Sequence, residues 1–229
     1  MNFSRQIVLL FLVSATDCLI TDFAKGAGSF STVVIDPGHG GFDRGGIPGQ
    51  LVPEKMVALD TAMRLQKILE RAGVRTVMTR TTDVFVPLPM RTAIANAQRD
   101  AIFVSIHYNA SPRWRAHGIE TYCEDSAGAP LAARIQRDIL TQVSAENRGV
   151  KRAEYYVLRN CQIPAVLVEC GFLTNPIEAT LALSPSYRQR VAEQIAAGVI
   201  EQRSHPLPAP SPPPPRKKTH HHRYKLTKR

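Results

Sequence analysis

The 229-residue sequence lacks several features that mark other classes of protein. Its four cysteines (Cys18, Cys123, Cys161 and Cys170) include no CxxC pair, so their spacing does not resemble a paired-cysteine metal site. No Ser-x-x-Lys occurs, which disfavours a penicillin-sensitive serine peptidase. The apolar run at residues 7–13 is far too short to span a bilayer as a helix. The chemistry is therefore to be sought among histidine and acidic side chains.

Acidic residues are also missing from the C-terminal end of the chain. Residues 206–229 carry seven Lys or Arg residues and no Asp or Glu, so without them the formal charge of +10 falls to +3 for residues 1–205. Seven of the ten residues at 206–215 are proline, which favours an extended polyproline II spacer ahead of a basic stretch with three histidines at 220–222. We expect residues 204–229 to be a disordered tail that either stays unbound or contacts an anionic partner.

The N-terminus has the pattern of an export signal. Arg5 supplies a positive charge, residues 7–13 are the short apolar segment, and residues 13–15 (VSA) fit a small-residue cleavage site. A buried N-terminal helix or strand is the alternative. We expect a signal peptide at residues 1–15, a short linker at 16–31, and export to the periplasm or cell envelope.

The alternation of strand and helix patterns predicts an α/β domain. Short apolar runs favour buried strands, and apolar residues spaced by three or four favour helices. We expect strands at residues 32–36, 74–79, 102–106, 118–123, 155–158 and 165–169, and helices at 54–72, 90–100, 130–143 and 185–202. This order predicts, for residues 32–203, an open, mostly parallel, twisted sheet of about six strands with helices on both faces.

Two histidines and two acids fall where predicted strands end or where a predicted helix begins. They are His39, Glu54, His107 and Glu169. Ligands of open parallel sheets bind beyond the carboxyl ends of the strands, so we expect these side chains to converge there. Two imidazoles and one carboxylate are the ligand set of a catalytic Zn²⁺ with an open position, and a second carboxylate can act as general base. The pattern predicts a zinc hydrolase.

Four segments carry a resemblance to a known family. They are residues 34–41 (VIDPGHGG) with Glu54 and Lys55 following, residues 105–110 (SIHYNA), residues 118–122 (GIETY) and residues 164–175 (PAVLVECGFLTN). In this order and spacing they resemble the motifs of the zinc-dependent N-acetylmuramoyl-L-alanine amidases, over roughly residues 32–202.

The resemblance implies a reaction and a role for each residue. It implies Zn²⁺ held by His39, Glu54 and His107, with Glu169 as the catalytic base. The bond cleaved would join the lactyl group of N-acetylmuramic acid to L-alanine of the peptidoglycan stem peptide, in cell-wall turnover or daughter-cell separation. The substrate partner would be peptidoglycan or a muropeptide. Export favours anionic wall polymer or lipid over nucleic acid as a partner of the tail, with an unbound tail as the alternative, and the protein is expected to be a monomer.

Some members of the resembled family carry a helical insertion that plugs the zinc site until an activator displaces it. Only 61 residues separate His107 from Glu169 here, and they must already supply a strand, a helix and a strand. We therefore expect a site that is open without a helix-displacing activator.

Several alternatives remain open at the level of sequence. A zinc carboxypeptidase or other peptidase acting on stem peptides would use the same metal chemistry, and a non-catalytic wall-binding module is a third interpretation. Glu120 either orients a ligand histidine or is a structural acid. Asn109 either contacts the substrate or only ends its strand.

Overall fold

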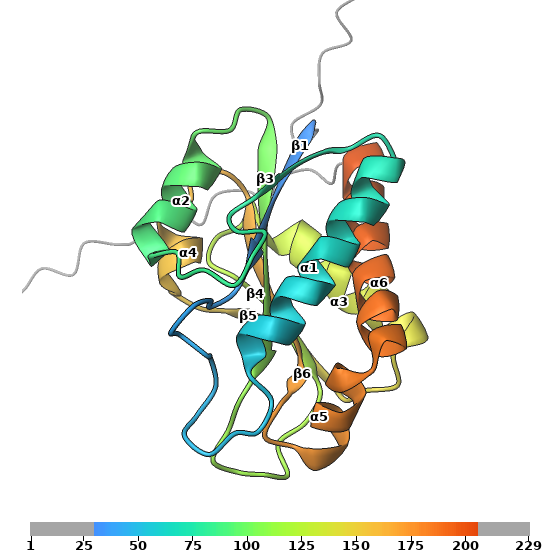
Figure 1. The fold of residues 1–229 in the computed structure, drawn as a ribbon. Helices are drawn as coiled ribbons and strands as arrows, with labels where there is room; N and C mark the ends of the chain where they lie inside the picture. The colour runs from blue at the N-terminus through green and yellow to red at the C-terminus, as the bar shows by residue number, and fades with distance from the viewer. Residues whose placement is uncertain (1–29, 206–229) are drawn as a thin grey trace, which may run out of the picture.

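The computed structural model of the protein describes residues 30–205. Its centre is a six-stranded sheet in the order β2-β1-β3-β6-β4-β5 (Figure 1). All neighbouring strands are parallel except β4 and β6, which run antiparallel. The strands are β1 (Thr32–Pro37), β2 (Arg75–Met78), β3 (Ala101–Asn109), β4 (Ile119–Cys123), β5 (Asn147–Arg152) and β6 (Ala165–Phe172). The predicted fold class, a mostly parallel sheet between helices, is confirmed.

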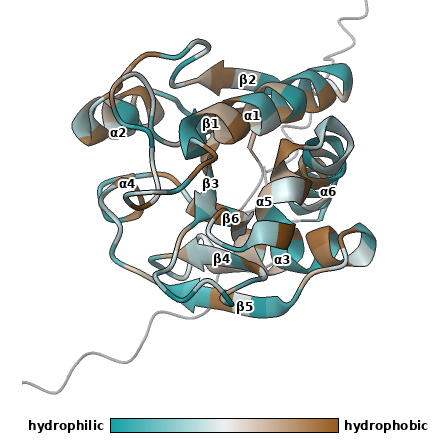
Figure 2. Cartoon of the chain, turned by 60° about the horizontal axis from the view of Figure 1, so that its bottom comes forward, coloured by the Kyte–Doolittle hydropathy of each residue, from teal (hydrophilic) through white to brown (hydrophobic). Residues whose placement is uncertain are grey.

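Helices cover both faces of the sheet. They are α1 (Glu54–Arg71), α2 (Leu88–Asn96), α3 (Ala129–Gln142), α4 (Tyr156–Arg159), α5 (Pro176–Leu183) and α6 (Pro185–Ser204). The larger core packs α1, α3, α5 and α6 on one face, and the smaller core packs α2 and α4 on the other. Figure 2 looks onto the bottom of Figure 1 and shows these two groups on opposite sides of the sheet.

Local sequence explains where α1 begins and ends. Pro53 is the N-cap residue and has an extended conformation, so the helix begins at the residue that follows it. Gly73 takes a φ of 71° after the helix, a left-handed value that favours glycine. The N–H of Val74 donates to the carbonyl of Leu69 (2.9 Å), and the N–H of Gly73 donates to that of Glu70 (3.0 Å). These two bonds form a Schellman cap, which satisfies carbonyl groups at the helix end.

Three local predictions were wrong or incomplete. Residues 155–158, predicted as a strand, instead include the short helix α4. Strand β5 was not predicted because its sequence, NRGVKR, is polar and lies at the edge of the sheet, where burial imposes no apolar pattern. Helix α5 was also missed, although Asn175 caps it by accepting hydrogen bonds from the backbone N–H groups of Ile177 and Glu178.

Some predictions fall on residues that the structure does not describe. The predicted signal peptide (1–15), most of the linker (16–31) and nearly all of the tail (204–229) lie outside residues 30–205. Phe30, the first described residue, is buried in the larger core. None of the helices within the described range is long and apolar enough to cross a membrane.

Candidate metal centre

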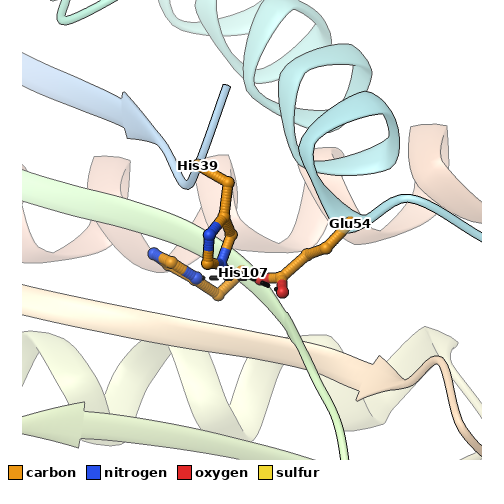
Figure 3. Close-up of side chains that lie close together, drawn as sticks. All are labelled: His39, Glu54 and His107. Atoms are coloured by element: carbon orange, nitrogen blue, oxygen red, sulfur yellow. Dashed lines mark hydrogen bonds and ion pairs between the residues drawn. The ribbon is translucent and has the colours of Figure 1, made fainter. Parts of the chain in front are cut away.

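Three of the predicted site residues lie together at the carboxyl edge of the sheet. His39 lies in the loop after β1, Glu54 is the first residue of α1, and His107 lies near the end of β3. One ligand atom of each side chain lies within 4.8 Å of the other two. Figure 3 shows the three side chains meeting at one point. Two imidazole nitrogens and one carboxylate oxygen fit the protein donor set of a catalytic zinc ion.

The Glu54 carboxylate joins the two imidazoles. Its Oε1 lies 2.8 Å from Nδ1 of His107, and its Oε2 lies 3.0 Å from Nε2 of His39 (Figure 3). The backbone N–H of Tyr108 also donates to Oε1, at 3.0 Å. Burial alone would raise the pKa of Glu54, but the hydrogen bonds from His107 and His39 outweigh it and lower the pKa to about 2. The carboxylate is therefore ionised at neutral pH, the state that metal ligation requires.

His39 is oriented by Asp43 and by an unusual backbone conformation. Its Nδ1 lies 2.8 Å from Oδ2 of Asp43, which leaves Nε2 directed at Glu54. A carboxylate on the far nitrogen fixes the tautomer and the ring orientation of a ligand histidine. The φ of His39 is 59°, a left-handed value that is rare outside glycine and recurs at functional sites. Asp43 was not predicted, although its spacing of four from His39 in a glycine-rich loop was a usable signal.

Gly38 lets the loop after β1 pass against the ring of His107. A Cβ at residue 38 would lie 2.3 Å from Cε1 of His107, too close for either group to stay in place. We expect Gly38→Ala to displace His107 and to weaken zinc binding by about 10- to 100-fold, the range for residues that orient metal ligands. Calorimetric titration with zinc checks this. The control is Gly49→Ala, which strains the backbone, at a φ of 83°, but whose Cβ meets nothing within 4 Å; equal zinc affinities for the two variants would contradict the role given to Gly38.

Two buried arginines hold the loop after β1 in place. Arg80 donates to the carbonyl oxygen of Gly38 at 2.6 Å. Arg91 donates to Oδ1 of Asp36 at 2.7 Å and to the carbonyl oxygen of His39 at 2.6 Å. Neither arginine was predicted from the sequence. The sequence did carry a signal that such a partner was needed. Asp36 is an acid at the end of an apolar strand, and a buried carboxylate needs a charged or hydrogen-bonding partner.

Glu169 lies beside this group in β6, where it is paired with His107 of β3. Its Oε2 is buried and has no hydrogen-bond partner among residues 30–205. Burial raises the pKa of Glu169 well above its ordinary value of 4.5, and the negative charges of Glu54 and Glu120 raise it further. A buried carboxylate with a raised pKa and an unused oxygen suits the acceptance of a proton from a molecule bound next to it.

Glu120 and Asn109 are hydrogen-bonded to each other and, within the described residues, not to the candidate ligand histidines. Glu120 is paired with Glu169 across β4 and β6, and within the described residues it makes no hydrogen bond to either histidine. Its carboxylate accepts hydrogen bonds from Asn109, Tyr122, Arg148 and Lys151. Asn109 uses its other amide atom, Oδ1, to accept from the N–H of Ala110 at 2.8 Å.

A cavity of about 640 Å³ contains the candidate metal centre. Its lining includes His39, Glu54, His107 and Glu169. Phe85, Val86 and Leu88 line one part of the wall, and Tyr155, Tyr156 and Val157 line another. Asn109 also faces this space. The volume is that of a small-molecule site, and its mixture of apolar walls with a few polar groups is typical of one.

The chain is similar to amidases of known family. The model of the N-acetylmuramoyl-L-alanine amidase family matches residues 33–201. N-acetylmuramoyl-L-alanine amidase LytC of Bacillus subtilis is 36% identical over 173 residues, which cover 74% of this chain and 35% of LytC. The probable cell wall amidase LytH of Staphylococcus epidermidis is 36% identical over 171 residues, which cover 73% of this chain and 57% of LytH. The chain therefore spans about a third of the length of LytC and somewhat more than half of LytH.

A solved structure shares the fold. The N-acetylmuramoyl-L-alanine amidase of Clostridium difficile 630 superposes with a TM-score of 0.74 and is 34% identical. The match covers 78% of this chain and 99% of that chain. The arrangement of sheet and helices is therefore that of an amidase catalytic domain.

Proposed function

This chain belongs to the N-acetylmuramoyl-L-alanine amidase family, and we propose that it is a zinc-dependent hydrolase of peptidoglycan. The bond it cleaves would join the lactyl group of N-acetylmuramic acid to L-alanine of the stem peptide. The observation that carries the proposal is the group of His39, Glu54 and His107 within 4.8 Å, with the unused Glu169 oxygen beside it.

Each residue of the proposed site has a defined task. His39, Glu54 and His107 would hold the zinc ion, and Asp43 would keep the ring of His39 in the ligating tautomer. When bound there, zinc supplies a Lewis acid for the carbonyl oxygen and lowers the pKa of a water molecule. Glu169 takes the proton of the attacking water on its free oxygen and delivers it to the leaving nitrogen of L-alanine. The raised pKa of the Glu169 carboxyl favours the first transfer, because the group accepts a proton more readily than an exposed glutamate does.

Among residues 30–205, no helix would need to be displaced from this site. Between β3 and β6 the structure places β4, α3, β5 and α4, and from this segment only Ala110 and residues 155–157 line the cavity. Helix α3 packs in the larger core on the opposite face of the sheet from α4. This placement supports a site that works without an activator that removes a plug.

Zinc dependence is tested by removing and restoring the metal. We expect a chelator to lower the release of stem peptide from a purified muropeptide by at least about 100-fold, since the ion supplies several kcal/mol of transition-state stabilisation. Added zinc should restore it. Mass spectrometry identifies the product, which should be an intact stem peptide beginning with L-alanine.

The same measurement separates the competing functions. A stem peptide shortened at its carboxyl end would indicate a zinc carboxypeptidase instead of an amidase. Binding to peptidoglycan without any cleavage by folded, zinc-loaded protein would favour a wall-binding module. Full activity after complete removal of metal would contradict the zinc mechanism.

The location and the accessory segments belong to the same proposal. We propose that residues 32–203 are the catalytic domain of an exported, monomeric enzyme of the cell envelope. Relatives that are named cell wall amidases support an extracellular substrate. The basic segment after residue 204 would then contact anionic wall polymer or lipid.

A further inference from the structure

A row of ionisable side chains crosses four neighbouring strands, from the candidate metal centre to the edge of the sheet. His107 of β3 is paired with Glu169 of β6, and Glu169 is paired with Glu120 of β4. Residues paired in this way project from the same face of a sheet. Beyond Glu120, the pairing of β4 with β5 shifts register, and Arg148 lies in this irregular stretch of β5. The row therefore ends in the cation of Arg148 on β5, and Figure 2 shows β5 at the edge of the sheet.

Two cations share the single carboxylate of Glu120. Nε of Arg148 donates to Oε2 at 2.8 Å, and Nζ of Lys151 donates to the same oxygen. The side chain of Glu120 is 3% exposed, whereas those of Arg148 and Lys151 are 29% and 38% exposed. The guanidinium of Arg148 also lies over the ring of Phe172, 4.9 Å from its centroid, which limits its movement. The trio has a net charge of +1, and both positive groups face solvent.

Both cations have N–H groups that donate to no acceptor within the described part of the chain. Among residues 30–205, the ammonium of Lys151 donates only to Glu120, and Nη2 of Arg148 donates to no residue. Glu146 attracts Arg148 electrostatically, but no hydrogen bond joins the two in that range. An ammonium and a guanidinium with free N–H groups, held in place by a buried acid, are suited to bind an anionic oxygen.

The two cations lie next to the cavity of the candidate metal centre. Asn109 lines the cavity and donates to Glu120 at 2.6 Å. Tyr155 also lines it and contacts Tyr122, with ring centroids 5.1 Å apart. The ammonium of Lys151 lies 6.0 Å from the centroid of the Tyr122 ring. A substrate that fills the cavity over Glu169 can therefore extend toward Lys151.

We propose that Lys151 and Arg148 bind a carboxylate of the stem peptide, beyond the amide that is cleaved. The inference rests on the proposed amidase function. Neighbouring strands are about 4.8 Å apart, so β5 lies about 10 Å from Glu169 in β6. An extended peptide advances about 3.3 Å per residue, so the second or third residue of the stem reaches the cations.

The charges of the substrate indicate which half of it lies near Lys151 and Arg148. The lactyl carboxyl group of the sugar is consumed in the amide, so the sugar offers no other anion. The stem peptide retains free carboxylates after L-alanine. The peptide therefore crosses β4 toward β5, and the glycan lies in the opposite direction.

Two muramoyl tripeptides that differ in one group test the proposal. In one, the second residue is D-glutamate with a free α-carboxylate; in the other, this group is a carboxamide. Binding is measured by calorimetry in the zinc-loaded Glu169→Gln variant, so that neither peptide is hydrolysed. We expect the carboxylate form to bind about tenfold more tightly, which corresponds to about 1.4 kcal/mol. Adding Lys151→Met to this variant should reduce the ratio of the two affinities to about one. Adding Lys151→Arg instead should preserve the tenfold ratio.

Arg152→Met is the matched control. Arg152 lies in the same strand, its side chain is 74% exposed, and it pairs with Glu124 instead of Glu120. This variant loses the same charge and should keep the tenfold ratio. Equal binding of the two peptides by the Glu169→Gln variant, with no loss of affinity for either when Lys151→Met is added, would overturn the carboxylate site, even if the parent protein cleaves both. Discrimination without any cleavage by the parent would instead contradict the amidase function and leave the anion site standing.

Discussion

Replacing Glu169 with glutamine is expected to lower kcat by about 10²- to 10⁴-fold, the contribution of a general acid–base residue. Glutamine keeps the shape of the side chain but cannot accept the proton of the attacking water. The free oxygen of Glu169 makes no hydrogen bond within the described part of the chain, so the substitution breaks no structural contact. Turnover of a muropeptide, followed by mass spectrometry, measures the loss.

The control for Glu169→Gln is Glu193→Gln, which removes the same charge from an exposed position of α6. That variant should keep full activity. Zinc affinity should stay within about threefold in the Glu169 variant, because the three ligand side chains are unchanged. Activity within tenfold of the parent protein would eliminate Glu169 as the base.

Replacing Glu169 with glutamine is also expected to change how the stability of the protein depends on pH. In the metal-free protein the pKa of Glu169 is raised, so the native state keeps this proton to a higher pH than the unfolded chain does. Between the two pKa values the native state binds more protons, and stability therefore falls as pH rises. Glutamine does not titrate. The melting temperature of metal-free Glu169→Gln should exceed that of the parent protein by a margin that grows as pH rises above about 4.3. A margin that is constant with pH would contradict the raised pKa.

Replacing Arg91 with methionine is expected to destabilise the protein by about 3–5 kcal/mol, the cost of leaving one buried charge without its partner. Arg91 is 2% exposed and Asp36 is 1% exposed. The variant also loses the hydrogen bond to the carbonyl oxygen of His39, so the loop that carries this ligand loses a support. Denaturant unfolding measures the free energy of unfolding. The midpoint of the transition should fall with little change in its slope.

Two further variants serve as controls for Arg91→Met. Arg99→Met removes an exposed arginine just after the same helix and should change stability by no more than about 0.5 kcal/mol. Combining Arg91→Met with Asp36→Asn should recover part of the loss, because the uncompensated charge disappears. A double variant less stable than Arg91→Met alone would show that the loss arises from packing and not from charge.

Much of the fold followed from local patterns. The apolar strands at 32–36, 102–106 and 165–169 are buried on both faces, so their sequences carry a continuous apolar signal. The edge strand β5 carries no such signal, since its residues are half exposed and polar. Residues 155–158 were mistaken for a strand because a four-residue helix is too short to establish a helical period.

The candidate ligands could be predicted because each stands at a recognisable break in the chain. His39 follows a strand within a glycine-rich turn, and Glu54 opens a helix directly after proline. Their supports could not be predicted in the same way. Arg91 reaches Asp36 across 55 positions of sequence, and no local pattern records such a contact.

The sequence by itself determined the order of five strands and of the four longest helices, the chemical types gathered at the strand ends and the likeness to the amidase motifs. These depend on neighbouring residues, whose periodicity and turn chemistry are written locally in the chain. Only the tertiary structure decided that Glu54 joins both imidazoles, that Glu169 is left with an unused oxygen, and that Glu120 faces Arg148 and Lys151. These contacts depend on the register of strands distant in sequence, because pairing across a sheet selects which side chains share a face.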